Sequence, residues 1–262
     1  MLARQRQARI LDEVRRAGGV RVSELTTLLG VSDMTIRRDL DQLASDGAIQ
    51  KVHGGAVLGS HVTEEPGFEV KSNIAQPAKQ AIAARAAQFI EAGTAIALSA
   101  GTTTWGLAQF VASIPGLTVV TNSTTVADTI ATNDSTKQTV ILTGGVRTPS
   151  AALVGPVADA TIRSLHVDQL FLGVHGMDAR AGFTTPNLAE AETNRALIAR
   201  ARKVIVVADS SKWGTVGLAD FGALSAADIL ITDDAISAEA RAALSEAVGE
   251  LVIVEYPQAD AS

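Results

Sequence analysis

The sequence predicts an α/β protein in two parts, a small helical N-terminal module and a larger domain built on a mainly parallel sheet. Short apolar runs bounded by turn residues recur in the larger part, and Ala-rich segments with helical spacing lie between them. Before residue 57 the pattern differs, because three short helical segments precede a turn-rich stretch. With 262 residues, 47% of them hydrophobic and 19% charged, the chain can bury a core of this size.

The N-terminal module starts with three predicted helices. Arg4–Ala17 ends at a Gly-Gly pair, which stops a helix. Ser23 is expected to cap a second helix, Glu24–Leu29, and Ser32 is expected to cap a third, Asp33–Ser45. A helix, a short Gly-containing turn and another helix form a helix-turn-helix arrangement.

The third helix has a polar face. Its core face is formed at i, i+4, i+7 spacing by Ile36, Leu40 and Leu43. The opposite face carries Met34, Arg38, Asp41 and Ser45, and it is flanked by Thr35, Arg37 and Gln42. In a major groove, Arg binds guanine, Gln binds adenine and hydroxyl groups bind phosphates or bases. Periodicity alone is equally compatible with an ordinary three-helix module whose surface charges are solvated.

A small hairpin, or wing, is predicted at residues 48–57, where Lys51 and His53 can reach a DNA backbone. The string VSDMTIRRDLDQL at 31–43, followed by KVHGGA at 51–56, resembles the winged helix-turn-helix of the DeoR family. That family's motif reads V-S-x-x-T-I-R-R-D-L-x-x-L and then H-G-G-A, and the resemblance spans residues 3–58.

The resemblance implies that Thr35, Arg37 and Arg38 contact DNA from the recognition helix. Asp39 is expected to be the intrahelical partner of an arginine, and Met34 is ambiguous between the two faces. The full set expected at the DNA is Ser23, Ser32, Met34, Thr35, Arg37, Arg38, Gln42, Lys51 and His53.

Residues 59–74 are predicted to form a linker, and residues 75–256 are predicted to form a Rossmann-like domain. The resemblance to the DeoR family implies that this domain binds an effector and oligomerises. Seven apolar runs predict its strands, namely Ala95–Leu98, Leu117–Thr121, Thr139–Thr143, Leu170–Val174, Val204–Ala208, Ile229–Thr232 and Leu251–Val254. Helices are predicted between them at Gln80–Glu91, Thr125–Ala131, Glu190–Ala201 and Ala238–Ala247. Ligands of such sheets bind beyond the carboxyl ends of the strands, so the loops there are the candidate site.

Five successive strand ends carry Gly, hydroxyl or charged residues. The first loop, SAGTTT at 99–104, precedes a helix, and its hydroxyls and free N–H groups suit an anion. Taken alone, this loop indicates no more than a capped helix start. Turn preferences do not explain Arg147 and Lys212, two cations expected at the same edge of the sheet.

These loops resemble the effector domain of DeoR-family regulators over residues 75–235. That domain is related in fold to ribose-5-phosphate isomerase, glucosamine-6-phosphate deaminase and coenzyme A transferases. The family's first loop reads D-x-G-T-T, and Ser99 here replaces the aspartate. His175 either faces the pocket or has a structural role.

The resemblance implies that Thr102, Thr103 and Thr104 hold the phosphate of a sugar phosphate. It also implies contacts with the sugar hydroxyls or the anion by Asn122, Arg147, Asp178, Glu190 and Lys212. The full set expected at the effector is Ser99, Gly101, Thr102, Thr103, Thr104, Asn122, Gly144, Gly145, Arg147, His175, Asp178, Glu190 and Lys212.

The function that the resemblance implies is a DNA-binding repressor of carbohydrate-metabolism genes, a dimer or tetramer that a phosphorylated sugar releases from its operator. The alternative is a sugar-phosphate isomerase or deaminase with an appended DNA-binding module. Such an enzyme needs a carboxylate base, and Ser99 in place of aspartate weakens this alternative.

No cofactor or metal is expected, because cysteine is absent and no His/Asp/Glu cluster has metal-ligand spacing. No apolar run approaches the roughly 18 residues that span a bilayer, and the polar N-terminus predicts a cytoplasmic protein.

The formal net charge of −6 argues, as a total, against a nucleic-acid partner. The charge is unevenly distributed, however. Residues 1–57 hold 9 Lys and Arg against 7 Asp and Glu, a balance of +2, and the remainder holds 13 against 21, a balance of −8. DNA contact is therefore expected only in the N-terminal module.

Overall fold

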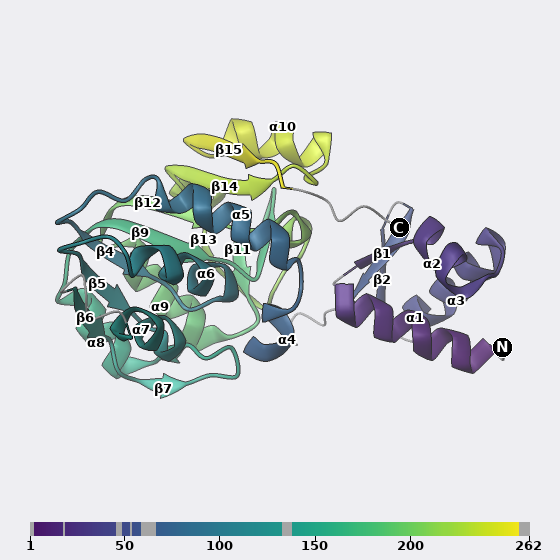
Figure 1. Cartoon of the computed structure of the whole chain (residues 1–262), viewed down its shortest axis with the longest axis horizontal. Coiled ribbons are helices and arrows are strands. Elements are labelled where there is room, and N and C mark those ends of the chain that lie inside the picture. Colours follow the sequence, from purple (N-terminus) through teal and green to yellow (C-terminus); the bar gives the residue numbers. More distant parts are fainter. Residues whose placement is uncertain are drawn as a thin grey trace. The chain divides into compact units, whose positions relative to one another are not determined.

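The computed structural model describes residues 3–17, 19–45, 49–52, 54–58, 67–132 and 138–256 (Figure 1). Two compact units can be distinguished. The smaller is formed by residues 1–64 with 73–75, and the larger by residues 65–72 and 76–262.

The smaller unit contains three helices and a small antiparallel sheet. The helices are α1 Ala3–Ala17, α2 Val22–Leu29 and α3 Asp33–Ser45. The strands, in the order β1-β3-β2, are β1 Gly19–Arg21, β2 Ile49–Val52 and β3 Gly55–Leu58. The helix-turn-helix and the hairpin are therefore confirmed. Their core contains Ile10, Val14, Leu25, Ile36 and Leu40, each at most 1% exposed.

Strand β1 was not predicted from the sequence. Its three residues pair with β3, with Val20 opposite Ala56 and Arg21 opposite Gly55. The backbones approach closely there, because a Cβ atom at Gly55 would lie 2.1 Å from the carbonyl oxygen of Val20. Glycine at this position therefore allows the strand that closes the sheet onto the helices.

The larger unit is built on a parallel sheet of seven strands, as the sequence predicted. Their order, which was not predicted, is β15-β14-β12-β9-β4-β5-β6. The strands are β4 Ala95–Leu98, β5 Thr118–Thr121, β6 Thr139–Leu142, β9 Val167–Gly173, β12 Ala201–Val207, β14 Ile229–Asp233 and β15 Glu250–Val254. Because all seven run in the same direction, their carboxyl ends lie along one edge of the sheet.

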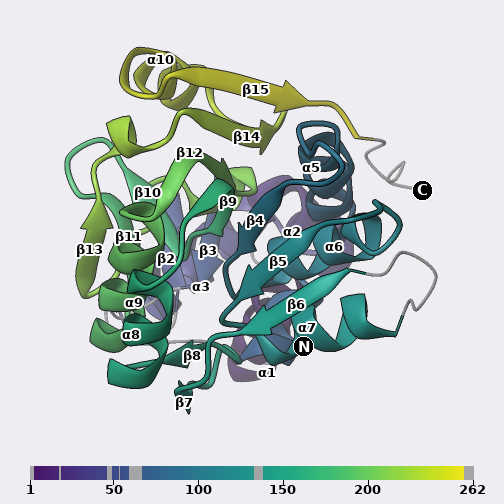
Figure 2. The same cartoon turned by 90° about the vertical axis from the view of Figure 1, so that its left-hand side faces the viewer.

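Helices cover both faces of this sheet (Figure 2). One face is covered by α5 Gln76–Ala87, α6 Thr102–Val111 and α7 Thr124–Ala131, and the other by α8 Pro156–Arg163, α9 Leu188–Ile198 and α10 Ala238–Ala247. Strand β9 contributes to both cores. Phe171 packs with the first group, while Leu170 and Leu172 pack with the second, because alternate side chains point to opposite faces.

Several elements of the larger unit were not predicted. A second sheet contains β10 Gly176–Asp178, β11 Gly182–Thr185 and β13 Ala219–Gly222, and a hairpin contains β7 Val146–Arg147 and β8 Leu153–Val154. Helix α4, Phe68–Ser72, lies within the segment predicted to be a linker. No helix in the described part of the chain is long and apolar enough to cross a membrane.

Candidate functional site

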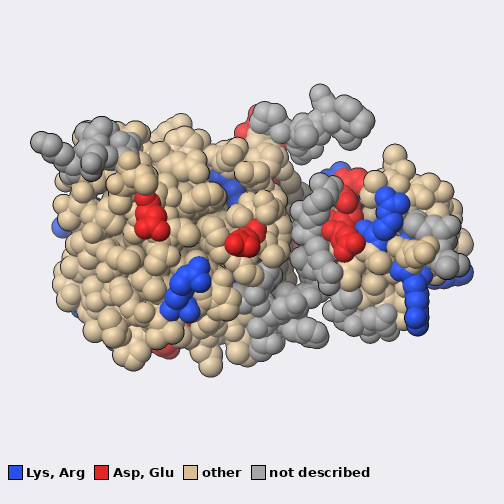
Figure 3. All heavy atoms as spheres, turned by 60° about the horizontal axis from the view of Figure 1, so that its bottom comes forward, with Lys and Arg blue, Asp and Glu red and all other residues tan. Residues whose placement is uncertain are grey.

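The polar face predicted for α3 is exposed. Met34 is 73% exposed, and Arg37, Arg38 and Gln42 are exposed as well, whereas Thr35 is half-buried. Ile36, Leu40 and Leu43 on the opposite face are buried, so this helix presents the side that periodicity predicted. On the face drawn in Figure 3, acidic and basic side chains lie next to one another on the smaller unit.

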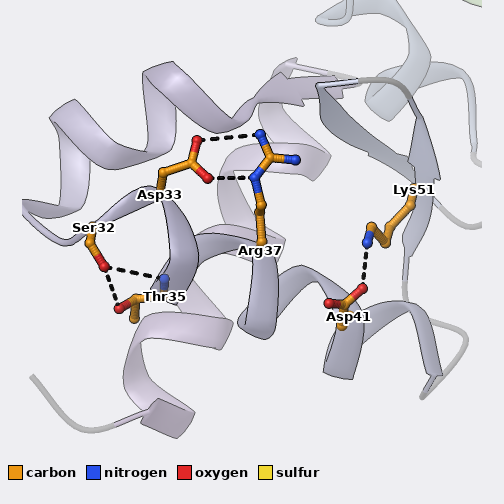
Figure 4. Close-up of polar contacts among 6 residues, drawn as sticks. All are labelled: Ser32, Asp33, Thr35, Arg37, Asp41 and Lys51. Atoms are coloured by element: carbon orange, nitrogen blue, oxygen red, sulfur yellow. Dashed lines mark hydrogen bonds and ion pairs between the residues drawn. The ribbon is translucent and has the colours of Figure 1, made fainter.

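The start of α3 is fixed by its cap. The hydroxyl of Ser32 accepts a hydrogen bond from the backbone N–H of Thr35 at 3.3 Å, and the two hydroxyl oxygens are 2.9 Å apart (Figure 4). The predicted cap of α2 is wrong. That helix begins at Val22, so Ser23 lies in its first turn, and Glu24 accepts a hydrogen bond from the Arg21 N–H instead.

Most charged side chains around α3 are paired. Arg37 pairs with Asp33 one turn earlier, and Lys51 of the wing pairs with Asp41 (Figure 4). Asp39 is buried and pairs with Arg6 of α1, so the expected intrahelical partner is wrong. In the part of the chain that the structure describes, Arg38 has no hydrogen bond or ion pair. The predicted contact residue His53 lies outside the described residues.

A shallow groove runs along α3 beside α1. From α3 and its cap, Ser32, Met34, Thr35, Arg38 and Gln42 line this groove, and Arg6 and Gln7 of α1 form its other side.

The larger unit has a pocket at the carboxyl ends of its strands. Seven of the predicted effector residues meet in it, namely Gly101, Thr102, Thr103, Asn122, His175, Glu190 and Lys212. Residues that the sequence did not single out complete the lining, among them Phe68, Lys71, Ser150, Thr185 and Asn194.

The first loop turns directly into α6 at one wall of this pocket. The first N–H groups of a helix have no acceptor within the helix, and no side chain caps α6. Gly101 has a φ of 154°, and a Cβ there would lie 3.2 Å from the hydroxyl of Thr104. Thr102 and Thr103 line the pocket beside these N–H groups, so this wall can bind an anion.

Glu190 lies at another wall and is held by hydroxyl groups from separate segments. Its Oε1 accepts hydrogen bonds from Thr148, at 2.7 Å, and from Ser150, while its Oε2 accepts one from Thr185 at 3.2 Å. Asn187 caps α9 by accepting from the N–H of Glu190. The carboxylate is thereby fixed in place.

Cationic groups gather around the pocket. Lys71 from α4 and Lys212 from the 3₁₀ turn Ser210–Lys212 line it. Lys79 is buried nearby, and its Nζ donates to the carbonyl oxygen of Lys71 at 2.6 Å. Burial lowers the pKa of Lys79 to about 8, although the carboxylate of Asp209 opposes this effect.

The charges of these lysines also affect the pKa of two further groups, His175 and Asp209. Burial, together with the charges of Lys71 and Lys212, lowers the pKa of His175 to about 3, so its imidazole is neutral at pH 7. Burial alone would raise the pKa of Asp209. The charges of Lys212 and Lys79 and the hydrogen bonds from Ser211 outweigh it and hold that pKa below its ordinary value.

Six predicted effector residues do not line the pocket, namely Ser99, Thr104, Gly144, Gly145, Arg147 and Asp178. Ser99 and Thr104 are buried and support the backbone: Ser99 accepts from the N–H of Gly173 at 2.9 Å, and Thr104 donates to the Gly101 carbonyl at 3.0 Å. Both hydroxyls are therefore structural.

The remaining four residues also follow strands, but they lie outside the pocket. Gly144 and Gly145 lead into the β7–β8 hairpin, which leaves the Arg147 side chain exposed. Asp178 closes the turn between β10 and β11 by accepting from the N–H groups of Arg180 and Ala181, at 2.8 and 3.0 Å. Of the two cations expected at this edge, only Lys212 reaches the pocket.

The sequence carried little signal for the residues it missed. Phe68 and Lys71 lie in a five-residue helix inside the predicted linker, and Ser150 lies between two-residue strands. Thr185 and Asn194 belong to β11 and α9. Among the described residues, no group of three His, Asp or Glu side chains is placed to hold a metal ion.

Two family models match the chain. A DeoR-like helix-turn-helix domain matches residues 6–62, and a DeoR C terminal sensor domain matches residues 74–234. The HTH-type transcriptional regulator GlpR of Haloferax volcanii is 36% identical, over 94% of this chain and 96% of its own length. The glycerol-3-phosphate regulon repressor of Escherichia coli is 32% identical, over 87% and 90%.

A solved D-ribose-5-phosphate isomerase matches 52% of this chain and 52% of its own at 17% identity, with a TM-score of 0.38. The two family models and the full-length relatives, by contrast, account for both units of the chain. The chain belongs to the DeoR family of DNA-binding transcriptional regulators.

Proposed function

We infer that this regulator represses genes of carbohydrate metabolism and that a phosphorylated sugar releases it from its operator. The observation that carries the inference is the pocket at the strand ends, where the uncapped start of α6 meets Lys71 and Lys212. The names of two relatives support it, the glycerol-3-phosphate regulon repressor and the putative aga operon transcriptional repressor of E. coli. The isomerase alternative is set aside because the family consists of regulators.

The effector is proposed to bind with its phosphate against Gly101–Thr103 and its sugar toward Glu190. A helix N-terminus and two lysines favour a doubly charged anion. A carboxylate accepts hydrogen bonds from sugar hydroxyls, and Asn122 and Asn194 supply further polar groups. Ser99, Thr104, Gly144, Gly145, Arg147 and Asp178 are not part of this proposal.

Operator binding is assigned to the exposed face of α3 and the wing. Arg38 suits guanine and Gln42 suits adenine, while the hydroxyls of Ser32 and Thr35 suit phosphates or bases. Lys51 of the wing is proposed to contact the DNA backbone. Arg37 completes this set once its exposed pair with Asp33 opens.

The assembly is proposed to be a dimer or tetramer, which places two recognition helices about one DNA turn, roughly 34 Å, apart. We also propose that the chain divides into a DNA-binding domain at 3–58, a linker at 59–74 and an effector domain at 75–256. A cytoplasmic location and DNA contacts by Ser23 and His53 are proposed as well. The coupling free energy between operator binding and effector binding is expected to be about 1–3 kcal/mol per site.

A thermal-shift screen of the full chain against a panel of sugar phosphates tests this function. A ligand at one hundred times its Kd stabilises its site by about 3 kcal/mol, which raises Tm. The ligand that raises Tm should also weaken the electrophoretic shift of an operator duplex. Stabilisation by neutral sugars or nucleosides, with none from phosphorylated sugars, would contradict the phosphate assignment, and turnover of the ligand would contradict the regulatory role.

A further inference from the structure

Met34 is unusual among the apolar residues of α3. Its side chain is 73% exposed, whereas Ile36 and Leu40 on the same helix are at most 1% exposed. A single exposed apolar residue is common on protein surfaces. Met34, however, lies in the first turn of the recognition helix, where helix-turn-helix proteins contact bases, and it lines the groove among polar side chains.

The arginine one turn further along is free to act with it. Arg37 is held by Asp33, as Figure 4 shows, while Arg38 is exposed and makes no hydrogen bond or ion pair within the described residues. Met34 and Arg38 both line the groove, four residues apart. Four residues of helix correspond to about 6 Å, or about two base-pair steps of about 3.4 Å.

The chemistry of the two side chains differs in a way that matches two kinds of base. A methionine thioether offers no hydrogen-bond donor and only a weak acceptor, so it cannot read the polar edge of a base. In the major groove the apolar feature of the bases is the 5-methyl group of thymine, while guanine presents the two acceptors that arginine binds.

We propose that Met34 and Arg38 read two neighbouring positions of the operator: Met34 covers the 5-methyl group of a thymine, and Arg38 binds a guanine within two base pairs of it. The proposal rests on the operator binding assigned to α3 above. It makes Met34 a determinant of sequence specificity and leaves Arg37 for phosphate contact. If Met34 instead lay against deoxyribose or toward solvent, thymine methyl groups would not affect binding.

The test starts from a duplex that the full-length protein enriches from a random-sequence pool. Each thymine is then replaced by deoxyuridine, which removes the methyl group and leaves the hydrogen-bonding edge unchanged. Affinities are measured by fluorescence anisotropy for the wild type, Met34→Ala, Met34→Leu and Arg38→Ala. Leu28→Ala, which removes an exposed apolar side chain from α2, is the matched control.

We expect one thymine per half-site at which loss of the methyl group weakens wild-type binding about fourfold, the effect of one buried methyl group. Met34→Ala should be insensitive to that replacement, while Met34→Leu and Leu28→Ala should remain sensitive. Arg38→Ala should lose its preference for a guanine within two base pairs of the same thymine. Unchanged circular dichroism and Tm will show that each variant is folded.

Three results would overturn the proposal. The first is equal sensitivity of the wild type and Met34→Ala at every thymine, and the second is no sensitivity at any thymine. The third is a sensitive thymine more than two base pairs from the guanine that Arg38→Ala stops selecting. In all three cases an operator exists, so the proposed function stands. Enrichment of no sequence at all would overturn the function together with this inference.

Discussion

The buried amine of Lys79 should make the larger unit less stable at neutral pH than it would be with an apolar residue there. Lys79 lies on α5 with 5% of its surface exposed, and its ammonium donates a hydrogen bond to the carbonyl oxygen of Lys71. Methionine is a suitable replacement, because it is unbranched, flexible and similar in length.

The magnitude follows from the pKa. A fall in the pKa of Lys79 from 10.5 to about 8 corresponds to about 3 kcal/mol against the charged form in the folded state. Below pH 8 the lysine is charged in both states, so the folded protein bears this whole cost. Between pH 8 and 10.5 the unfolded chain holds a proton that the folded chain has released, so the stability contributed by this group rises with pH.

Lys79→Met removes this cost and loses one hydrogen bond, worth about 1 kcal/mol. We therefore expect the variant to be more stable than the wild type by about 2 kcal/mol at pH 7, with the difference vanishing near pH 10. Both tryptophans, Trp105 and Trp213, belong to the larger unit, so tryptophan fluorescence during urea unfolding reports on this unit alone.

The control is Gln80→Met, which places the same side chain at the adjacent, exposed position of α5. It should change the free energy of unfolding by no more than about 0.5 kcal/mol at any pH. A Lys79→Met protein that is less stable than the wild type at pH 7 would refute the reasoning. A stabilisation that does not shrink between pH 7 and pH 10 would refute it too, because the gain would then not come from the ionised amine.

Three further predictions concern the two proposed sites. Arg38→Ala should weaken operator binding by about 1–3 kcal/mol in anisotropy titrations while ligand-induced thermal stabilisation persists; undiminished affinity would remove this arginine from the interface. Lys212→Ala should keep operator binding but lose release by the effector in mobility-shift assays, and normal release would exclude Lys212 from the site. The wild type should lose stability as pH falls from 6.5 toward 3, because His175 takes up a proton in the unfolded chain but stays neutral in the folded chain. In urea unfolding at pH 5, this loss should be smaller in His175→Asn, by at most about 2 kcal/mol.

The seven strands of the main sheet were predictable because each contains a short continuous apolar run. The five inner strands are largely buried between the helices, and the edge strands β6 and β15 are apolar although they are more exposed. Boundaries were less predictable where polar residues start a strand. Strand β12 begins at Ala201, but Arg202 and Lys203 interrupt the apolar pattern, and the run was recognised only from Val204. The helix α9 was predicted to reach Ala201 but ends at Ile198, and Ala201 is already the first residue of β12.

The unpredicted strands are short, and β1 and β13 also depend on partners that are distant in sequence. β10 pairs with β11, and β11 pairs with β13 more than thirty residues later, so no local alternation marks any of them. Glycine at the start of β10 also permits the backbone at Thr215 to approach this strand closely, since a Cβ at Gly176 would lie 2.1 Å from the Thr215 carbonyl oxygen. The same dependence on tertiary contacts explains why Lys71 was missed and why Arg147, a cation after a strand, was expected in the pocket.

The charge balance of the smaller unit also changes meaning once its ion pairs are known. The surplus of +2 over residues 1–57 suggested a few placed cations, yet Arg37 and Lys51 have aspartate partners that neutralise their charges. Both pairs are exposed, and exposed pairs contribute at most about 1 kcal/mol, so a DNA phosphate can replace each aspartate at small cost. The buried pair of Arg6 and Asp39 cannot be exchanged in this way, because separating it leaves a buried carboxylate without its cation. On the proposed function, the unit therefore brings few phosphate contacts to its operator, and its affinity should depend less steeply on salt than that of a protein with a broad cationic surface. Specificity must then come from Arg38 and the other exposed side chains of α3.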